Sequence, residues 1–154
     1  MPLDKHDHSL LELLQQDCQT PLRELAETVH LSLPSVQRRI KKLKKEGYIR
    51  RNVAILEPEK LGQAITIIVE VKARKTNTED LERLKGLFSG DEIQQCYYVT
   101  GETDFMLTIL VSSMSRFNEM SDRLFHQNPD VESFRTIIVL DRVKDTLDVR
   151  QEGP

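Results

Sequence analysis

A short basic segment, residues 31–47, constrains the fold of this chain more than any other stretch does. Its apolar side chains Val36, Ile40 and Leu43 recur with the spacing of one helical face. Gly47 follows the last of them, and glycine is common just beyond the end of a helix. The segment therefore predicts one short helix that is anchored along a narrow apolar stripe.

The remainder of this predicted helix is polar and basic. At about 100° per residue, the side chains that point away from the stripe are Pro34, Ser35, Arg38, Lys41, Lys42 and Lys45. The chain has a net charge of −3, but residues 38–51 hold eight Lys and Arg and only one acidic residue. Cations gathered on one surface let an acidic protein bind nucleic acid, and the alternative is a helix face that only contacts water.

Two further helices are predicted before this one, over residues 3–16 and 21–29. Thr20 is expected to cap the second helix, with Glu24 completing a capping box, and Ser32 is expected to cap the third. Three short helices with a tight turn between the second and the third are typical of the helix-turn-helix.

The third helix of such a motif reads base edges in the major groove with its N-terminal half. Arg38 or Arg39 could fork onto guanine and Gln37 could pair with adenine, while cations further along the helix suit phosphates. The expected contacts to double-stranded DNA are Ser32, Pro34, Ser35, Gln37, Arg38, Arg39, Lys41, Lys42 and Lys45.

Two of these side chains also have a simpler structural explanation. Ser32 is expected mainly as a helix cap, because its hydroxyl can accept from a free N–H of the first turn. For Arg39, a DNA contact and an ion pair inside the domain are expected about equally. The carboxylates that could form this ion pair are Glu12, Glu24 and Glu27.

The second half of the chain has a different pattern, with β-branched runs separated by helical segments. Strands are predicted at residues 64–74, 93–100, 105–111 and 131–140, and helices at 79–88 and, capped by Ser115, up to 127. The order βαββαβ is that of a ferredoxin-like sandwich with two helices on one face of the sheet. The other face is expected to expose Ile67, Val69 and Val71 or their alternates, which a dimer would bury.

The fold class that follows is α+β, a winged-type helix-turn-helix domain and then a ferredoxin-like βαββαβ domain. Residues 52–56 are short and β-rich, so we expect a strand there. The predicted organisation is a helix-turn-helix domain at 1–50, a strand and linker at 51–62, and the ferredoxin-like domain at 63–154.

The sequence contains no pattern typical of an enzyme active site. It has no Ser/His/Asp order, no phosphate-binding loop and no dinucleotide fingerprint. His6 and His8 would point apart on a helix, and Cys18 and Cys96 are predicted to be free, reduced thiols. We therefore expect no catalysis, no metal and no cofactor. No run of 18 apolar residues and no signal peptide are present, so a cytoplasmic protein without a membrane partner is expected.

Short motifs along the chain resemble those of the Lrp/AsnC, or feast/famine, family of bacterial and archaeal transcriptional regulators. The matching stretches lie, in order, within residues 3–11, 24–26, 31–47, 101–105, 128–131 and 143–144. Their joint order and spacing carry the resemblance. The chain departs from the family at residues 18–21, usually a Gly-Arg turn, and at His30, often glycine, so the turn at His30 must bend without glycine.

The resemblance implies dimers that often assemble into octamers, and a small amino-acid effector bound at a subunit interface near residues 101–104. The residues it implies are Thr100, Gly101 and Asp104, and from across the interface His126, Thr136, Ile138 and Val139. Taken alone, the same loop is typical of an ordinary turn, with glycine for a positive φ and aspartate for local hydrogen bonds.

Two other functions stay open. Sirohaem decarboxylases resemble this family in their two-domain plan, although an enzyme has no use for the eight cations of residues 38–51. The second is a stand-alone effector-binding or RNA-binding ferredoxin-like module, for which Tyr97 and Tyr98 are only a weak match to the aromatic pairs of an RNA-recognition sheet.

Overall fold

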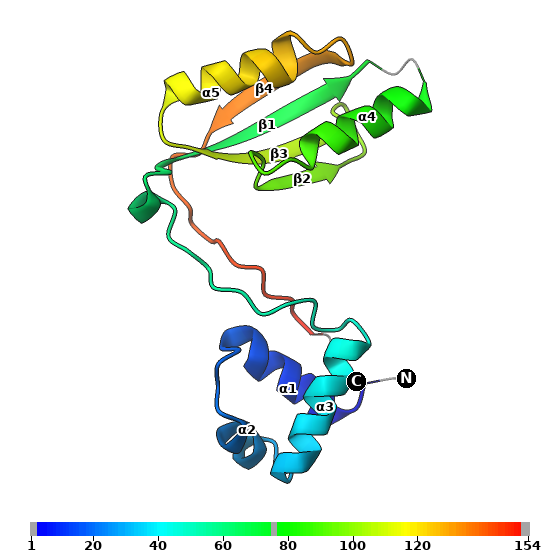
Figure 1. The fold of residues 1–154 in the computed structure, drawn as a ribbon, viewed down its shortest axis with the longest axis vertical. Coiled ribbons are helices and arrows are strands. Elements are labelled where there is room, and N and C mark those ends of the chain that lie inside the picture. The colour runs from blue at the N-terminus through cyan, green and yellow to red at the C-terminus, as the bar shows by residue number, and fades with distance from the viewer. Residues whose placement is uncertain (1–2, 75–76, 152–154) are drawn as a thin grey trace. The chain divides into compact units, whose positions relative to one another are not determined.

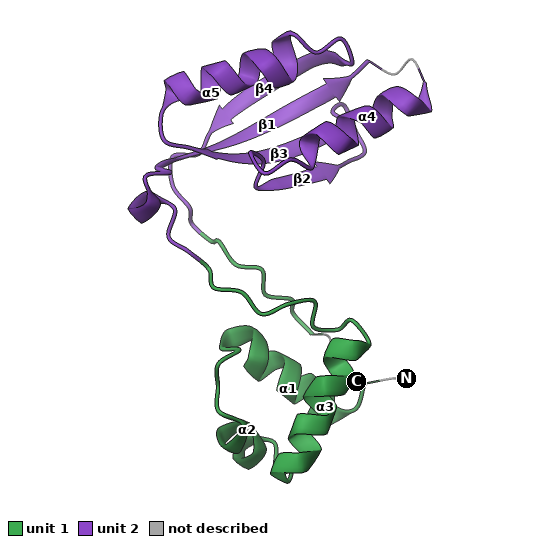
Figure 2. Ribbon diagram, viewed as in Figure 1, with its two compact units in different colours: residues 1–55, 144–154 green, residues 56–143 purple. Residues whose placement is uncertain are grey.

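The computed structural model describes residues 3–74 and 77–151, and the chain divides into two compact units (Figure 2). One unit comprises residues 1–55 together with 144–154, and the other comprises residues 56–143. The C-terminal segment therefore groups with the N-terminal helices, whereas the sequence assigned it to the ferredoxin-like domain.

The first unit contains the three predicted helices (Figure 1). They are α1, Lys5–Gln16, α2, Leu22–Thr28, and α3, Leu33–Lys45. Their shared core consists of Leu10, Leu25, Ala26, Val29, Val36 and Leu43, all buried. The apolar stripe of the basic helix lies in this core, as its spacing predicts, and the helix-turn-helix prediction is confirmed.

The helix caps differ from the predicted ones. Thr20 donates its hydroxyl to the Asp17 carbonyl (2.8 Å), and the N-cap of α2 is Pro21, which offers no side-chain acceptor. Ser32 occupies the N-cap position of α3 but its side chain makes no capping hydrogen bond. Pro34 at the second helical position has no N–H, which removes one of the two donors that such a cap uses.

The turn between α2 and α3 bends at His30, whose φ is 54°. This is the left-handed region, which a non-glycine residue occupies at a cost of about 1–2 kcal/mol. The Leu31 N–H donates to the Ala26 carbonyl at 3.0 Å and closes the turn. The chain thus makes this turn with His30 at the position where the Lrp/AsnC family often has glycine.

The second unit begins with a 3-10 turn, Glu59–Leu61, and contains a four-stranded antiparallel sheet in the order β2-β3-β1-β4. Its strands are β1, Ile65–Ala73, β2, Gln95–Tyr98, β3, Phe105–Val111, and β4, Val131–Ile138. The helices are α4, Thr78–Phe88, and α5, Met114–Ser121, which continues into a π-helical turn, Asp122–His126. Both helices pack on the same face of the sheet (Figure 1), so the predicted ferredoxin-like order is confirmed.

The prediction for the two faces of β1 was wrong in its first choice of residues. Ile67, Val69 and Val71 lie fully buried under the helices, and their alternates Ile68 and Glu70 point to the uncovered face. Apolar residues occupy positions 67, 68 and 69 in succession, so the sequence alternation does not distinguish the two faces.

Two local predictions also need correction. Residues 51–57 form no strand, because no neighbouring segment among the described residues pairs with them. The cap of α5 is Ser113, whose hydroxyl oxygen accepts from the Arg116 N–H at 3.2 Å, and not Ser115.

Candidate nucleic-acid interface and effector loop

The outward face of α3 is exposed and basic. Val36 and Leu43 anchor the helix in the core, while Arg38, Lys41 and Lys45 point outward. Within residues 3–74 and 77–151, no carboxylate lies within 4.0 Å of these three cations. Charges that no acidic neighbour neutralises remain available to phosphate or to base acceptors.

The accessible face is turned slightly from the one that the helical spacing predicts. Ser32, Pro34 and Gln37 are exposed, but Ser35 and Lys42 are half-buried on one flank. The Lys42 ammonium also lies 3.9 Å from the Glu46 carboxylate. Lys42 is consequently less free to reach phosphate than the cations at the centre of the face.

The opposite flank is open and carries two residues that the sequence reasoning missed. Leu33 is 47% exposed at the first turn of α3, and Lys44 is exposed further along. On a helical wheel both lie within about 80° of the apolar stripe, so the spacing places them near the core. Only the packing of α1 and α2 leaves that flank uncovered.

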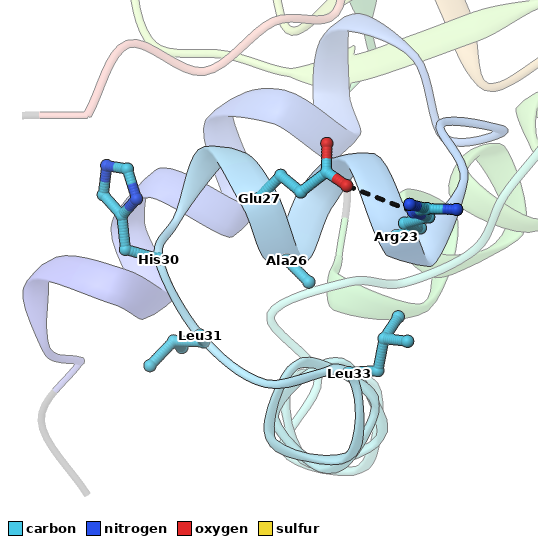
Figure 3. Close-up of a pocket in the computed structure, with 6 residues that line it drawn as sticks. All are labelled: Arg23, Ala26, Glu27, His30, Leu31 and Leu33. Atoms are coloured by element: carbon cyan, nitrogen blue, oxygen red, sulfur yellow. Dashed lines mark hydrogen bonds and ion pairs between the residues drawn. The ribbon is translucent and has the colours of Figure 1, made fainter.

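A pocket of about 630 Å³ lies beside the first turn of α3 (Figure 3). Its lining residues are Arg23, Ala26, Glu27, His30, Leu31 and Leu33. Arg23 bonds the Glu27 carboxylate across its rim at 3.1 Å. The pocket is formed by α2 and the turn, and it is the space that leaves Leu33 accessible.

Arg39, predicted as a possible base reader, is held inside the domain. One of its terminal nitrogens lies 2.8 Å from an Asp4 carboxylate oxygen and 2.7 Å from an Asp7 oxygen. The Arg39 side chain is 24% exposed and that of Asp7 is 7% exposed. The ion pair foreseen as the alternative therefore forms, but with the start of α1 and not with Glu12, Glu24 or Glu27.

The two partners of Arg39 also form the capping box of α1. Asp4 accepts from the Asp7 N–H at 3.0 Å, and Asp7 accepts from the Asp4 N–H at 3.2 Å. The Asp7 N–H and the Arg39 guanidinium together hold the pKa of Asp4 below its ordinary value. Arg39 thus fixes the N-terminus of α1 against α3. Among the described residues nothing bonds its buried Nε.

The hairpin loop between β2 and β3 combines exposed and buried groups. Thr100 and Gly101 are exposed, and Gly101 has a φ of 124°, which favours glycine. Asp104 is only 4% exposed. Its carboxylate accepts from the Ala73 N–H at 2.9 Å, and its own N–H donates to the Val71 carbonyl at 2.9 Å. Asp104 therefore fastens the loop to the end of β1.

His126 lies at the same end of the sheet as this loop. Its ring is 4.8 Å from the Phe134 ring, and it lines a second pocket of about 520 Å³. Arg74 was not predicted as a site residue but also lines this pocket. Its backbone N–H donates to the Asp130 carbonyl at 2.7 Å. A cation at the very end of the predicted strand, residues 64–74, is the signal that could have indicated it.

Within one chain, the remaining predicted effector residues lie beside the middle and the first residues of β1, away from the loop. Ile138 pairs with Ile67, and the Val139 N–H donates to the Thr66 carbonyl at 3.0 Å. Thr136 pairs with Val69 at the middle of the strand. The chain by itself therefore does not bring these three residues to Gly101, and the resemblance assigned them to a second subunit.

None of the helices in the described part of the chain has the length and apolar character that a membrane span requires. The described residues likewise hold no group of three or more His, Cys, Asp or Glu arranged for a metal ion.

Comparison with known proteins identifies both units. The family model for a winged helix-turn-helix DNA-binding domain matches residues 3–50, and that for the Lrp/AsnC ligand binding domain matches residues 66–149. The HTH-type transcriptional regulator y4tD of Sinorhizobium fredii is 36% identical over 97% of this chain and 89% of its own length. The DNA-binding transcriptional activator DecR of Escherichia coli is 32% identical, over 94% and 95%.

Among solved structures, a transcriptional regulator from Neisseria meningitidis in complex with L-methionine has a TM-score of 0.88. It is 30% identical in sequence, and the match covers 97% of each chain. These relatives are regulators of transcription and not enzymes. The chain belongs to the Lrp/AsnC family of DNA-binding transcriptional regulators.

Proposed function

We propose that this chain binds specific DNA sequences through α3 and that a small amino-acid-type effector controls this binding. The observation that carries the proposal is the outward face of α3, where Arg38, Lys41 and Lys45 have no acidic partner among the described residues. An anchored helix with a free basic face suits the major groove, which admits one helix.

The proposed contacts fall into two groups. Arg38 forks onto guanine and Gln37 pairs with adenine, because both extend from the N-terminal half of the helix. The groups expected near phosphates and the groove edge are Ser32, Pro34, Ser35, Lys41, Lys42, Lys44 and Lys45. Leu33 stands one turn before Gln37 and suits the methyl group of thymine, the one apolar group on a base edge there. Arg39 orients the helix and does not read a base.

Replacing Lys41 with alanine tests the phosphate contacts. We expect weaker binding to every DNA sequence by a similar factor, with the slope of log K against log salt reduced in magnitude by about 0.9. Fluorescence anisotropy at several salt concentrations measures both quantities. Lys60→Ala is a matched control from the other unit and should leave the slope unchanged. An unchanged slope for Lys41→Ala as well would remove the central support of the DNA-binding proposal.

The effector is proposed to bind at the loop that contains Thr100 and Gly101. A Cβ placed on Gly101 would have no other atom within 4 Å, so the space beside its backbone is open and a ligand can approach closely. The Neisseria meningitidis relative carries L-methionine, which supports an amino acid as the class of effector. His126, Thr136, Ile138 and Val139 complete the proposed site from a second subunit, and Asp104 supports the loop.

A thermal-shift screen of the twenty amino acids tests this site. An amino acid at one hundred times its Kd should stabilise the chain by about 2.7 kcal/mol, which raises the melting temperature by several degrees. Gly101→Ala forces a side chain into the φ of 124° and should abolish the shift. Gly86→Ala, in open space on α4, should preserve it. No shift with any amino acid would contradict the proposed class of effector.

A homodimer is the proposed functional unit, and assembly to an octamer follows the family resemblance. The uncovered face of the sheet carries Ile68, Ile137 and Tyr97, which a second sheet would bury. A two-fold dimer presents two copies of α3 to half-sites separated by about one or more helical turns, ~34 Å each. The proposed compartment is the cytoplasm, where DNA is accessible.

A further inference from the structure

The last described residues of the chain bind the first helix. The side-chain amide of Gln15 donates to the Val149 carbonyl at 3.2 Å and accepts from the Val149 N–H at 3.0 Å. One side chain thereby satisfies both backbone groups of one residue, as a neighbouring strand would do. This contact joins residues that are 134 positions apart in the sequence.

A second pair of hydrogen bonds lies on the same face of α1. The Gln151 amide donates to the His8 carbonyl at 3.1 Å, and its oxygen lies 2.6 Å from Nδ1 of His8. His8 and Gln15 are seven residues apart, which is about two helical turns. The C-terminal segment therefore lies along α1 and is held at two places.

Two chain segments therefore connect the first unit, residues 1–55 with 144–154, to the second unit, residues 56–143. We call these two units the DNA-binding unit and the ferredoxin-like unit. The chain leaves the DNA-binding unit after residue 55 and returns to it at residue 144. On the ferredoxin-like side, Arg142 bonds the Glu57 carboxylate at 2.6 Å and joins the two connecting segments. Residues 51–57 have no secondary structure, so the first connection alone would leave the helices widely mobile.

We propose that residues 144–151 act as a second tether, and that their docking on α1 restricts where α3 can reach and so sets which half-site spacing a dimer accepts. The proposal rests on the proposed DNA-binding function. A shorter reach raises the effective concentration of the second α3 at one spacing and lowers it at the others. Release of the segment should broaden the range of accepted spacings without changing how each α3 reads its own half-site.

The double variant Gln15→Ala/Gln151→Ala, called the tether variant below, removes the four hydrogen bonds between residues 149–151 and α1. Gln16→Ala is the matched control, because Gln16 is the exposed neighbour of Gln15 on α1. The DNA probes are a half-site that the wild-type chain selects from a random library, and duplexes that carry two copies separated by zero to ten base pairs. A chain ending at residue 148 repeats the test if the substitutions affect folding.

For the wild type and Gln16→Ala we expect affinity to vary by about tenfold or more between the best and the worst spacing. For the tether variant we expect this variation to fall to about two- to threefold, with the single half-site bound as before. A wild-type spacing profile in the tether variant would overturn the proposal. Failure to bind any selected half-site would instead count against the proposed function.

A measurement without DNA separates these outcomes further. In the tether variant, NMR relaxation of amides in α1–α3 should give a shorter rotational correlation time than in the wild type, because the unit moves more independently. The amides of β1–β4 should keep their wild-type value. An unchanged correlation time for α1–α3 would overturn the tether whatever the DNA experiments show.

Discussion

Replacing Arg38 with lysine should remove most of the sequence preference of this regulator while leaving its salt dependence in place. Lysine keeps the charge but cannot form the two parallel hydrogen bonds that an arginine makes to guanine. We expect a loss of about 1–3 kcal/mol on the preferred duplex. Binding to a random duplex should change little, because phosphate contacts dominate it.

The experiment compares Arg38→Lys, Arg38→Ala and wild type on a selected duplex and on a random one, at two salt concentrations. Arg38→Ala should lose both the preference and part of the salt slope. Lys41→Ala is the control that weakens both duplexes equally. If Arg38→Lys leaves the preference for the selected duplex unchanged, Arg38 contacts phosphate and another side chain reads the base.

Replacing Arg39 with methionine should destabilise the DNA-binding unit by about 2–3 kcal/mol. Removing one partner of a fully buried ion pair costs about 3–5 kcal/mol, and the partial exposure of Arg39 and Asp4 reduces this figure. Asp7 remains buried without its cation in the variant. Denaturant unfolding, followed by a probe in α1, measures the change.

Arg23→Met provides the matched control, since its ion pair with Glu27 is exposed and should contribute less than about 1 kcal/mol. The pH dependence of the free energy of unfolding gives a second measure of this ion pair, because the Asp7 N–H and the Arg39 guanidinium together lower the pKa of Asp4. The folded pKa of Asp4 lies below its unfolded value of about 3.9. Its stabilising contribution is therefore complete above that pH and disappears as the pH falls through the folded pKa. If Arg39→Met unfolds at the same denaturant concentration as the wild type, the structural role of Arg39 is contradicted and a DNA contact becomes its remaining predicted role.

The sequence was sufficient for the order of the six-element ferredoxin-like unit and the three N-terminal helices, because helical spacing and β-branched runs are easily told apart, but it also placed a strand at residues 52–56 that does not form. β3 was predicted with its exact bounds, because the nearly continuous apolar run Phe105–Val111 begins directly after the loop that ends at Asp104 and stops at Ser112. The face of β1 was not predictable, because apolar residues occupy both of its sides. The same limit applies to α3, where neighbouring helices and not the spacing decide that Leu33 is accessible.

Long-range partners were beyond the sequence for a different reason. The Arg39 partners are 32 and 35 positions away, and several other carboxylates were equally plausible by charge alone. The docking of Val149 on Gln15 depends on the path of the whole intervening chain. Asp104 was predicted to form local hydrogen bonds in the turn or to line the effector site, and only the end of β1 beside it makes it a buried acceptor.

The attachment of Asp104 to Ala73 divides the proposed effector loop into a frame and a variable part. Asp104 and the backbone of β1 form the frame, whose loss would loosen the sheet. Thr100, Gly101 and Glu102 are exposed. Substitutions at these exposed positions could therefore change which effector the proposed site accepts, while the frame that holds the loop stays intact.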